Sequence, residues 1–135
     1  MSDAAPWSYV PCSRPTTGPT PWCREAIRVL AQLDPGGRSA GCYNRRRVRD
    51  SQDTWSLHAC GRAVDWHPES RVRGREVADW IAWFGAPDVQ LIIYDGRQWG
   101  GTRGPVWHPY HGSDPHVDHL HIESRSATPR GSIAS

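Results

Sequence analysis

Residues 116–123 read HVDHLHIE, and this stretch determines how the C-terminal part of the chain folds. Successive side chains in a β-strand point to opposite faces of the sheet. Leu120 and Ile122 are therefore expected to face the core, while His119, His121 and Glu123 share the other face. Hydrophobic packing does not require two imidazoles on one face. The pattern therefore indicates either a metal site or histidines that lie at the surface or are satisfied by hydrogen bonds.

Residues 56–66 read SLHACGRAVDW and contain two further candidate ligands. His58 and Asp65 are seven residues apart, with small residues between them that let the backbone approach closely. A strand over residues 62–66 would end near the same cleft as His121 and would bring Asp65 there. Two imidazoles and one carboxylate, with an open position for water, meet the needs of a catalytic zinc ion.

Two amphipathic helices are predicted. Thr20 and Pro21 suit the N-cap and first turn of a helix, whose apolar residues continue to Leu33 before a turn at residues 34–37. A second helix is indicated by apolar residues at helical spacing, and we expect all of them in the core: Val77, Trp80, Ile81 and Phe84.

Several short strands accompany the helices. Residues 89–94 read as a buried strand, and Asp95-Gly96 as a hairpin turn before residues 97–99. Further strands are expected around Cys42 and Tyr43, at residues 62–66 and at residues 119–123. Two helices and four or five strands that do not strictly alternate predict an α+β fold, a small antiparallel sheet with helices packed on one face.

The length of 135 residues suits one domain with a single core and is too short for two. Residues 1–20 are rich in proline and lack a hydrophobic period, so they are predicted to form an extended arm. Residues 21–123 are expected to form the folded domain, followed by a flexible polar tail at residues 124–135.

Charge and hydropathy limit the possible partners. Sixteen basic residues, all arginine, stand against 14 acidic ones, and this even balance does not indicate a nucleic-acid-binding protein. No segment reaches the roughly 20 apolar residues of a membrane span, and the N-terminus lacks the features of a signal peptide. We expect a monomer made in the cytoplasm, with no membrane or nucleic-acid partner. The four cysteines could form disulfides or remain free buried thiols.

Two motifs carry a resemblance to a known family. Residues 56–65 match the pattern SxHxxGxAxD without a mismatch, and residues 118–121 (DHLH) are similar to the closing motif of the zinc D-alanyl-D-alanine carboxypeptidases. That family includes L-alanyl-D-glutamate endopeptidases and shares its fold with the hedgehog signalling domain. The similarity covers roughly residues 38–123, and it implies a hedgehog-like zinc peptidase domain within residues 21–123 that acts on peptidoglycan stem peptides.

The resemblance also implies roles for individual residues. His58, Asp65 and His121 would bind Zn²⁺, and Asp118, three residues before the last ligand, would be the general base. Strict strand alternation places Asp118 on the face away from His121, so the strand must begin at about His119 or the chain must bend there. A His-x-x-His-x-His pattern of some relatives also fits, which makes His116 the competing base. His119 would stabilise the oxyanion in either case.

Two residues are candidates for substrate binding. The family places an arginine before its first motif, and Arg46, within the basic run at residues 45–49, is our choice for that position. The run could instead be a solvated strand edge, a nucleic-acid patch or a surface for acidic groups of the cell wall. The Ser56 hydroxyl could orient substrate or a neighbouring ligand, or it could make a local backbone hydrogen bond.

These observations predict a peptidase that acts at the bacterial cell wall, as a phage endolysin or as a bacterial enzyme. Carboxypeptidase and endopeptidase action are both open, because the choice depends on whether the cleft is closed at one end. The alternative is a non-catalytic, zinc-stabilised binding module of the hedgehog type. The candidate base Asp118 argues against that alternative.

Overall fold

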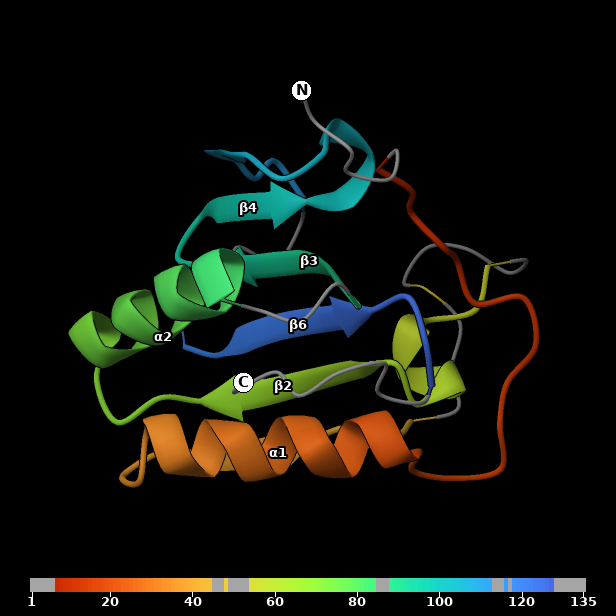
Figure 1. Ribbon diagram of the computed structural model, residues 1–135, viewed down its shortest axis with the longest axis horizontal. Coiled ribbons are helices and arrows are strands. Elements are labelled where there is room, and N and C mark those ends of the chain that lie inside the picture. Colours follow the sequence, from red (N-terminus) through yellow and green to blue (C-terminus); the bar gives the residue numbers. More distant parts are fainter. Residues whose placement is uncertain are drawn as a thin grey trace.

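A computed structural model describes residues 7–44, 48, 54–84, 88–112, 116 and 118–127. Its centre is a six-stranded sheet of order β1-β2-β6-β3-β4-β5, in which every neighbouring pair is antiparallel. The strands are β1 (Arg38–Gly41), β2 (Ala63–His67), β3 (Val89–Tyr94), β4 (Arg97–Gly100), β5 (Trp107–Pro109) and β6 (Leu120–Ser124). The last strand in the sequence, β6, lies between β2 and β3 at the centre of the sheet (Figure 1).

Two helices, α1 (Pro21–Leu33) and α2 (Arg71–Phe84), pack on the same face of this sheet. One apolar cluster joins buried residues of both helices to strand residues of that face, among them Val64, Ile92, Leu120 and Ile122. The predicted α+β class, an antiparallel sheet with helices on one face, is confirmed. Two short 3₁₀-helices complete the elements, η1 (Leu57–Cys60) and η2 (Gly101–Arg103).

Helix α1 begins where its sequence predicts. The Thr20 side chain accepts a hydrogen bond from the Cys23 backbone N–H, and Pro21 occupies the first turn. The residue that ends the helix, Asp34, is buried. Its carboxylate accepts hydrogen bonds from the indole of Trp66 and the backbone N–H of Glu69, which fastens the end of the helix to β2 and to the segment that follows it.

The predicted core face of α2 is only partly correct. Val77 and Ile81 are buried and Trp80 packs against the cluster, but Phe84 is 53% exposed. Phe84 is the last residue of the helix, so its side chain stacks against Trp80 and Trp83 at the helix end rather than entering the core.

The strand predictions need small corrections. The strand expected around Cys42 and Tyr43 lies earlier, at Arg38–Gly41, and those two residues follow it. The strands at Ala63–His67 and Leu120–Ser124 are each shifted by one residue from the expected ranges. A sixth strand, β5, was not predicted, because Trp107–Pro109 is short and contains a proline.

The described part of the N-terminal arm, residues 7–20, contains no helix and no regular strand. It is nevertheless attached to the domain at several points. The Trp7 indole donates to the Gly101 carbonyl, Tyr9 contacts Glu123, and Cys12 forms an isolated bridge with Trp55. The arm runs past the ends of the strands (Figure 1), where Tyr9 reaches Glu123 near the end of β6 and Val10 bonds to Gln90 near the start of β3.

All four cysteines form disulfides. Cys12–Cys60 joins the arm to η1, and Cys23–Cys42 joins α1 to the residue that follows β1. Of the two possibilities that the sequence left open, the structure therefore has the paired state. No helix in the described part of the chain has the length and apolarity needed to cross a membrane.

Candidate metal centre

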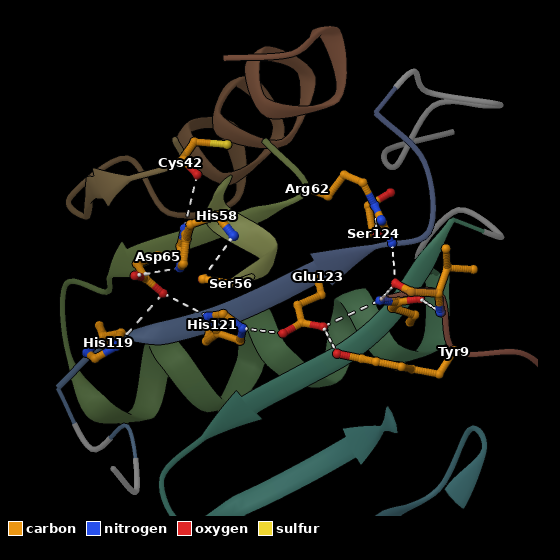
Figure 2. A network of polar contacts seen from close by, with 12 residues as sticks. Tyr9, Cys42, Ser56, His58, Arg62, Asp65, His119, His121, Glu123 and Ser124 are labelled. Atoms are coloured by element: carbon orange, nitrogen blue, oxygen red, sulfur yellow. Dashed lines mark hydrogen bonds and ion pairs between the residues drawn. The ribbon is translucent and has the colours of Figure 1, made fainter. Parts of the chain in front are cut away.

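Three side chains converge on the face of the sheet opposite the helices: His58 from η1, Asp65 from β2 and His121 from β6 (Figure 2). One ligand atom from each of them lies within 4.8 Å of those of the other two. His58 Nε2 is 3.1 Å from Asp65 Oδ2, and His121 Nδ1 is 3.0 Å from Asp65 Oδ1. The structure thus brings together the three residues that the sequence predicts as metal ligands.

Sheet register places two of the three ligands. Asp65 of β2 is directly opposite His121 of β6. Directly opposed residues of an antiparallel pair point to the same face and have closely spaced side chains. The flanking pairs Val64–Ile122 and Trp66–Leu120 face the helices and are buried. A slip of one residue would expose them, so burial of the apolar face holds the ligand pair in register.

Local turn chemistry places the third ligand. The Ser56 hydroxyl caps η1 by accepting a hydrogen bond from the His58 backbone N–H, at 3.2 Å. Gly61 ends η1 with φ of 61°, and its N–H bonds back to the His58 carbonyl. A side chain at Gly61 would also meet Thr20 Cγ2 at 2.4 Å, so both the backbone angle and the available space require glycine here.

Each histidine of the cluster uses its second ring nitrogen for an outer hydrogen bond. His58 Nδ1 lies 3.0 Å from the Cys42 carbonyl, which can only accept, so Nδ1 carries the proton. His121 Nε2 donates to Glu123 Oε2 at 2.8 Å. These bonds turn His58 Nε2 and His121 Nδ1 toward Asp65, as outer partners do for histidines that bind metals.

One buried ring nitrogen of the cluster lacks a hydrogen-bond partner among the described residues. His58 is 4% exposed, and among the described residues its Nε2 has no hydrogen-bond partner. Asp65 Oδ2 is at ion-pair distance from it but is not aligned for a hydrogen bond. Because Nδ1 carries the proton, Nε2 presents a lone pair to the cluster, and a buried lone pair without a partner is costly.

The charges of the cluster are strongly coupled. Burial raises the pKa of Asp65, but the hydrogen bond with His121 and the closeness of the His58 and His121 rings outweigh it and hold that pKa well below its usual range. Burial lowers the pKa of His121, yet the hydrogen bonds to Asp65 and Glu123, and their charges, raise it to about 9. Glu123 is likewise buried and is held ionised by His121, with its pKa lowered. A cation bound here would take over the role of the His121 proton.

The candidate bases lie at the edge of the cluster. Strand β6 begins at Leu120, and Asp118 and His119 lie in a bend before it, so the expected departure from strand alternation occurs. The Asp118 side chain is 76% exposed, and its carboxylate accepts from His119 Nδ1 at 2.9 Å. His119 Nε2 is 3.9 Å from Asp65 Oδ1, which puts His119 between the exposed carboxylate and a predicted ligand.

The competing base, His116, also lies beside the cluster. Its ring centroid is 4.6 Å from that of His119 and 5.4 Å from that of His121. Its φ of 55° is in the left-handed region, which is uncommon for a residue with a side chain and is often found near functional sites. His116 thus lies against the predicted ligand His121, whereas Asp118 is connected to the cluster through His119.

The two predicted substrate-binding residues differ in outcome. The buried Ser56 hydroxyl makes the local bond to the His58 N–H, one of the two roles that the sequence left open. Arg46 lies outside the described residues, as do Arg45, Arg47 and Arg49. A cavity of about 160 Å³ adjoins the cluster, lined by the end of β1, residues 42–44, His58 and Asp65. It offers space for a small group next to the ligands.

Several residues of the site were not identified from the sequence. Glu123 was placed on the correct face, but its bond to His121 follows only from the side-chain geometry. The Cys42 carbonyl and the Tyr9 hydroxyl are far from the two motifs in sequence, and no local pattern points to them. His67 donates from Nδ1 to the Asp118 carbonyl at 3.0 Å, and so borders the site.

The chain is similar to a known domain family. The family model described as the VldE C-terminal domain matches residues 15–121, which is most of the chain and includes all three converging residues. No curated protein and no solved structure matches the chain. The chain therefore belongs to the VldE C-terminal domain family.

Proposed function

We propose that this protein is a zinc-dependent peptidase that hydrolyses peptide bonds in peptidoglycan stem peptides. The observation that carries the proposal is the convergence of His58, Asp65 and His121, with the second ring nitrogen of each histidine already bonded to an oxygen acceptor. A hedgehog-like fold related to the zinc D-alanyl-D-alanine carboxypeptidases is part of the proposal. The two motifs at residues 56–65 and 118–121, and the antiparallel sheet with both helices on one face, support it.

The residues present fit a zinc ion. Catalytic zinc sites use three protein ligands of nitrogen and oxygen type and leave a fourth position for water. His58 Nε2 supplies a buried lone pair that no described residue satisfies, and His121 Nδ1 faces the same carboxylate from the other side. The adjoining cavity borders His58 and Asp65, so a substrate group could approach the fourth position from there.

The chain's own residues would divide the proton transfers of hydrolysis. Bound zinc would supply an acidified water and a polarised peptide carbonyl. Asp118 would accept the proton of the attacking water and pass it to the leaving amine as the C–N bond breaks. The hydrogen bond from His119 lowers the pKa of Asp118, which keeps this carboxylate ionised at neutral pH but makes it a weaker base. His119 would donate toward the developing oxyanion, and His116 remains the competing base.

Digestion of purified cell wall tests the proposal. Zinc-loaded protein should release muropeptide fragments, and their masses separate loss of terminal D-alanine from scission within the stem. Asp118→Ala should keep its zinc and lose about 10²- to 10⁴-fold in rate, with His116→Ala as the matched comparison. If His116→Ala shows the larger loss, His116 is the base. If zinc-loaded wild type releases no fragment, the peptidase proposal fails.

A non-catalytic zinc-stabilised binding module is the second candidate. The exposure of Asp118, whose carboxylate already bonds to His119, favours it over an enzyme with a sheltered base. This alternative predicts zinc binding without any release of fragments, and co-sedimentation with intact cell wall would then measure the binding.

We further propose action at the bacterial cell wall, either as a phage endolysin or as a bacterial peptidase. The two disulfides support a site of action outside the reducing cytoplasm, because disulfides persist in oxidising compartments. We expect the protein to act as a monomer with the peptidoglycan stem peptide as its partner.

A further inference from the structure

A chain of side-chain hydrogen bonds runs from the N-terminal arm into the candidate metal centre (Figure 2). The Tyr9 hydroxyl donates to Glu123 Oε1 at 2.7 Å, and Glu123 Oε2 accepts from His121 Nε2 at 2.8 Å. The two oxygens of one carboxylate therefore join a residue of the arm to a predicted metal ligand. Tyr9 and His121 are more than a hundred residues apart in the sequence, so only the fold brings them into one chain of bonds.

Glu123 depends on few partners for its orientation. Its side chain is 8% exposed, and a buried carboxylate needs protein donors to replace water. Among the described residues that contact Oε1, Tyr9 is the nearer donor, since Gln90 Nε2 lies at 3.4 Å. Hydrogen bonds to a charged acceptor are the stronger kind, so the Tyr9 bond has a large share in fixing the rotation of this carboxylate.

The arm itself is held firmly at this point. Val10 exchanges two hydrogen bonds with the Gln90 side chain, at 2.8 Å and 3.1 Å. The buried Arg62 guanidinium donates to the carbonyls of Val10, Pro11 and Ser124, and so joins the arm to the end of β6. With the Cys12–Cys60 disulfide three residues further on, Tyr9 is held in position without belonging to a helix or strand.

We infer that Tyr9 is a positioning residue for the metal ligand His121, and that it acts through Glu123. The inference rests on the proposed function, because it assigns Tyr9 a role toward the zinc site. If Glu123 rotates, the His121 ring that donates to it must follow, and the direction of Nδ1 toward Asp65 changes. Outer partners of this kind set ring orientation and metal affinity. The N-terminal arm is then part of the metal centre.

The test compares two tyrosine hydroxyl deletions, one connected to the site and one in the core on the helix side of the sheet. Tyr9→Phe removes the bond to Glu123, and Tyr94→Phe removes the bond from a buried tyrosine to the Arg71 carbonyl. Zinc affinity is measured by competition with a chromophoric chelator. We expect Tyr9→Phe to weaken zinc binding about three- to tenfold, which is less than the about 10- to 100-fold cost of losing a direct outer partner. Tyr94→Phe should stay within about twofold of wild type.

A double-mutant cycle separates positioning from a general effect on the fold. In a Glu123→Ala background the connection to His121 is gone, so adding Tyr9→Phe should change zinc affinity by less than about twofold. If the two losses multiply instead, Tyr9 acts independently of Glu123 and the inference is wrong. Should Glu123→Ala not fold, Glu123→Gln takes its place in the cycle.

A metal-free measurement distinguishes failure of the inference from failure of the proposed function. The His121 Nε2–H proton is bonded to a carboxylate and should give a slowly exchanging downfield NMR signal that weakens in Tyr9→Phe and persists in Tyr94→Phe. If wild type binds no zinc but this signal responds, the zinc proposal fails and the positioning role stands. If wild type binds zinc and neither affinity nor the signal distinguishes the two variants, the positioning role is refuted.

Discussion

The two histidines of the candidate metal centre lie in regions that are held by different interactions. His121 is in β6, which pairs with β2 on one side and β3 on the other and buries Leu120 and Ile122 under the helices. His58 is in η1, a 3₁₀-helix of four residues that has a cap at each end. Both disulfides end beside it, because Cys60 belongs to η1 and the carbonyl of Cys42 accepts from His58.

This difference shows two ways of holding a ligand in place. A strand at the centre of a sheet has hydrogen-bonded neighbours on both sides, and its buried face fixes the register. A short 3₁₀-helix has few internal hydrogen bonds, so covalent links and side-chain caps supply the constraint. We expect damage to the first region to reduce the stability of the whole fold, and damage to the second to displace His58 while the pairing of Asp65 with His121 survives.

The largest effect is expected from Leu120→Ala in β6. Leu120 is fully buried, and removing its side chain should lower the free energy of unfolding by about 2–5 kcal/mol. Urea denaturation of the metal-free protein measures the loss, with Val106→Ala at a 53% exposed position as the control. A loss below about 1 kcal/mol for Leu120→Ala would contradict the central role of β6.

The disulfide beside η1 comes next. Replacing Cys12 and Cys60 by serine together should lower the free energy of unfolding by about 2–4 kcal/mol, because the disulfide closes a long segment of the unfolded chain. Hydrogen exchange should rise in residues 57–60 and stay low across the β2–β6 pair. The comparison variant with Cys23 and Cys42 replaced closes a shorter segment and should lose less stability. If exchange rises equally in β6, the two regions are not independent.

The smallest effect is expected from the cap of η1. Ser56→Ala removes the acceptor for the His58 N–H and should cost about 1 kcal/mol, together with a modest loss of zinc affinity. Ser70→Ala is the matched control, because Ser70 caps α2 by accepting from Arg73 and lies outside the site. The control should lose similar stability and no zinc affinity. Equal zinc affinity in both variants would mean that the cap does not position His58.

The sequence predicted the features that depend on near neighbours in the chain. The N-cap of α1 at Thr20, the hairpin at Asp95-Gly96 and the alternation in β6 all came from patterns of a few residues, and the structure has each of them. Phe84 marks the limit of this reasoning. Its helical spacing matches the core face, but a residue at the end of a helix can extend beyond the surface against which the helix packs.

The two motifs predicted the candidate ligands, but they did not predict which residues surround those ligands. The strand pattern left a metal site and satisfied histidines both open, and the resemblance carried by the two motifs then pointed to His58, Asp65 and His121. The order of the strands in the sheet could not be derived from these local patterns. That β6 inserts between β2 and β3 depends on which apolar faces pack together over the whole domain, and this insertion sets Asp65 opposite His121.

By itself, then, the sequence determined the local elements, the α+β class and the identity of the three converging side chains. Only the tertiary structure decided what surrounds them: the disulfide pairing, the Cys42 carbonyl on His58, and the path from Tyr9 through Glu123 to His121. The physical reason is the sequence separation between the interacting residues. Periodicity and caps act over one or two turns of chain, while these partners meet only after packing has brought distant segments within the few ångströms at which a hydrogen bond forms.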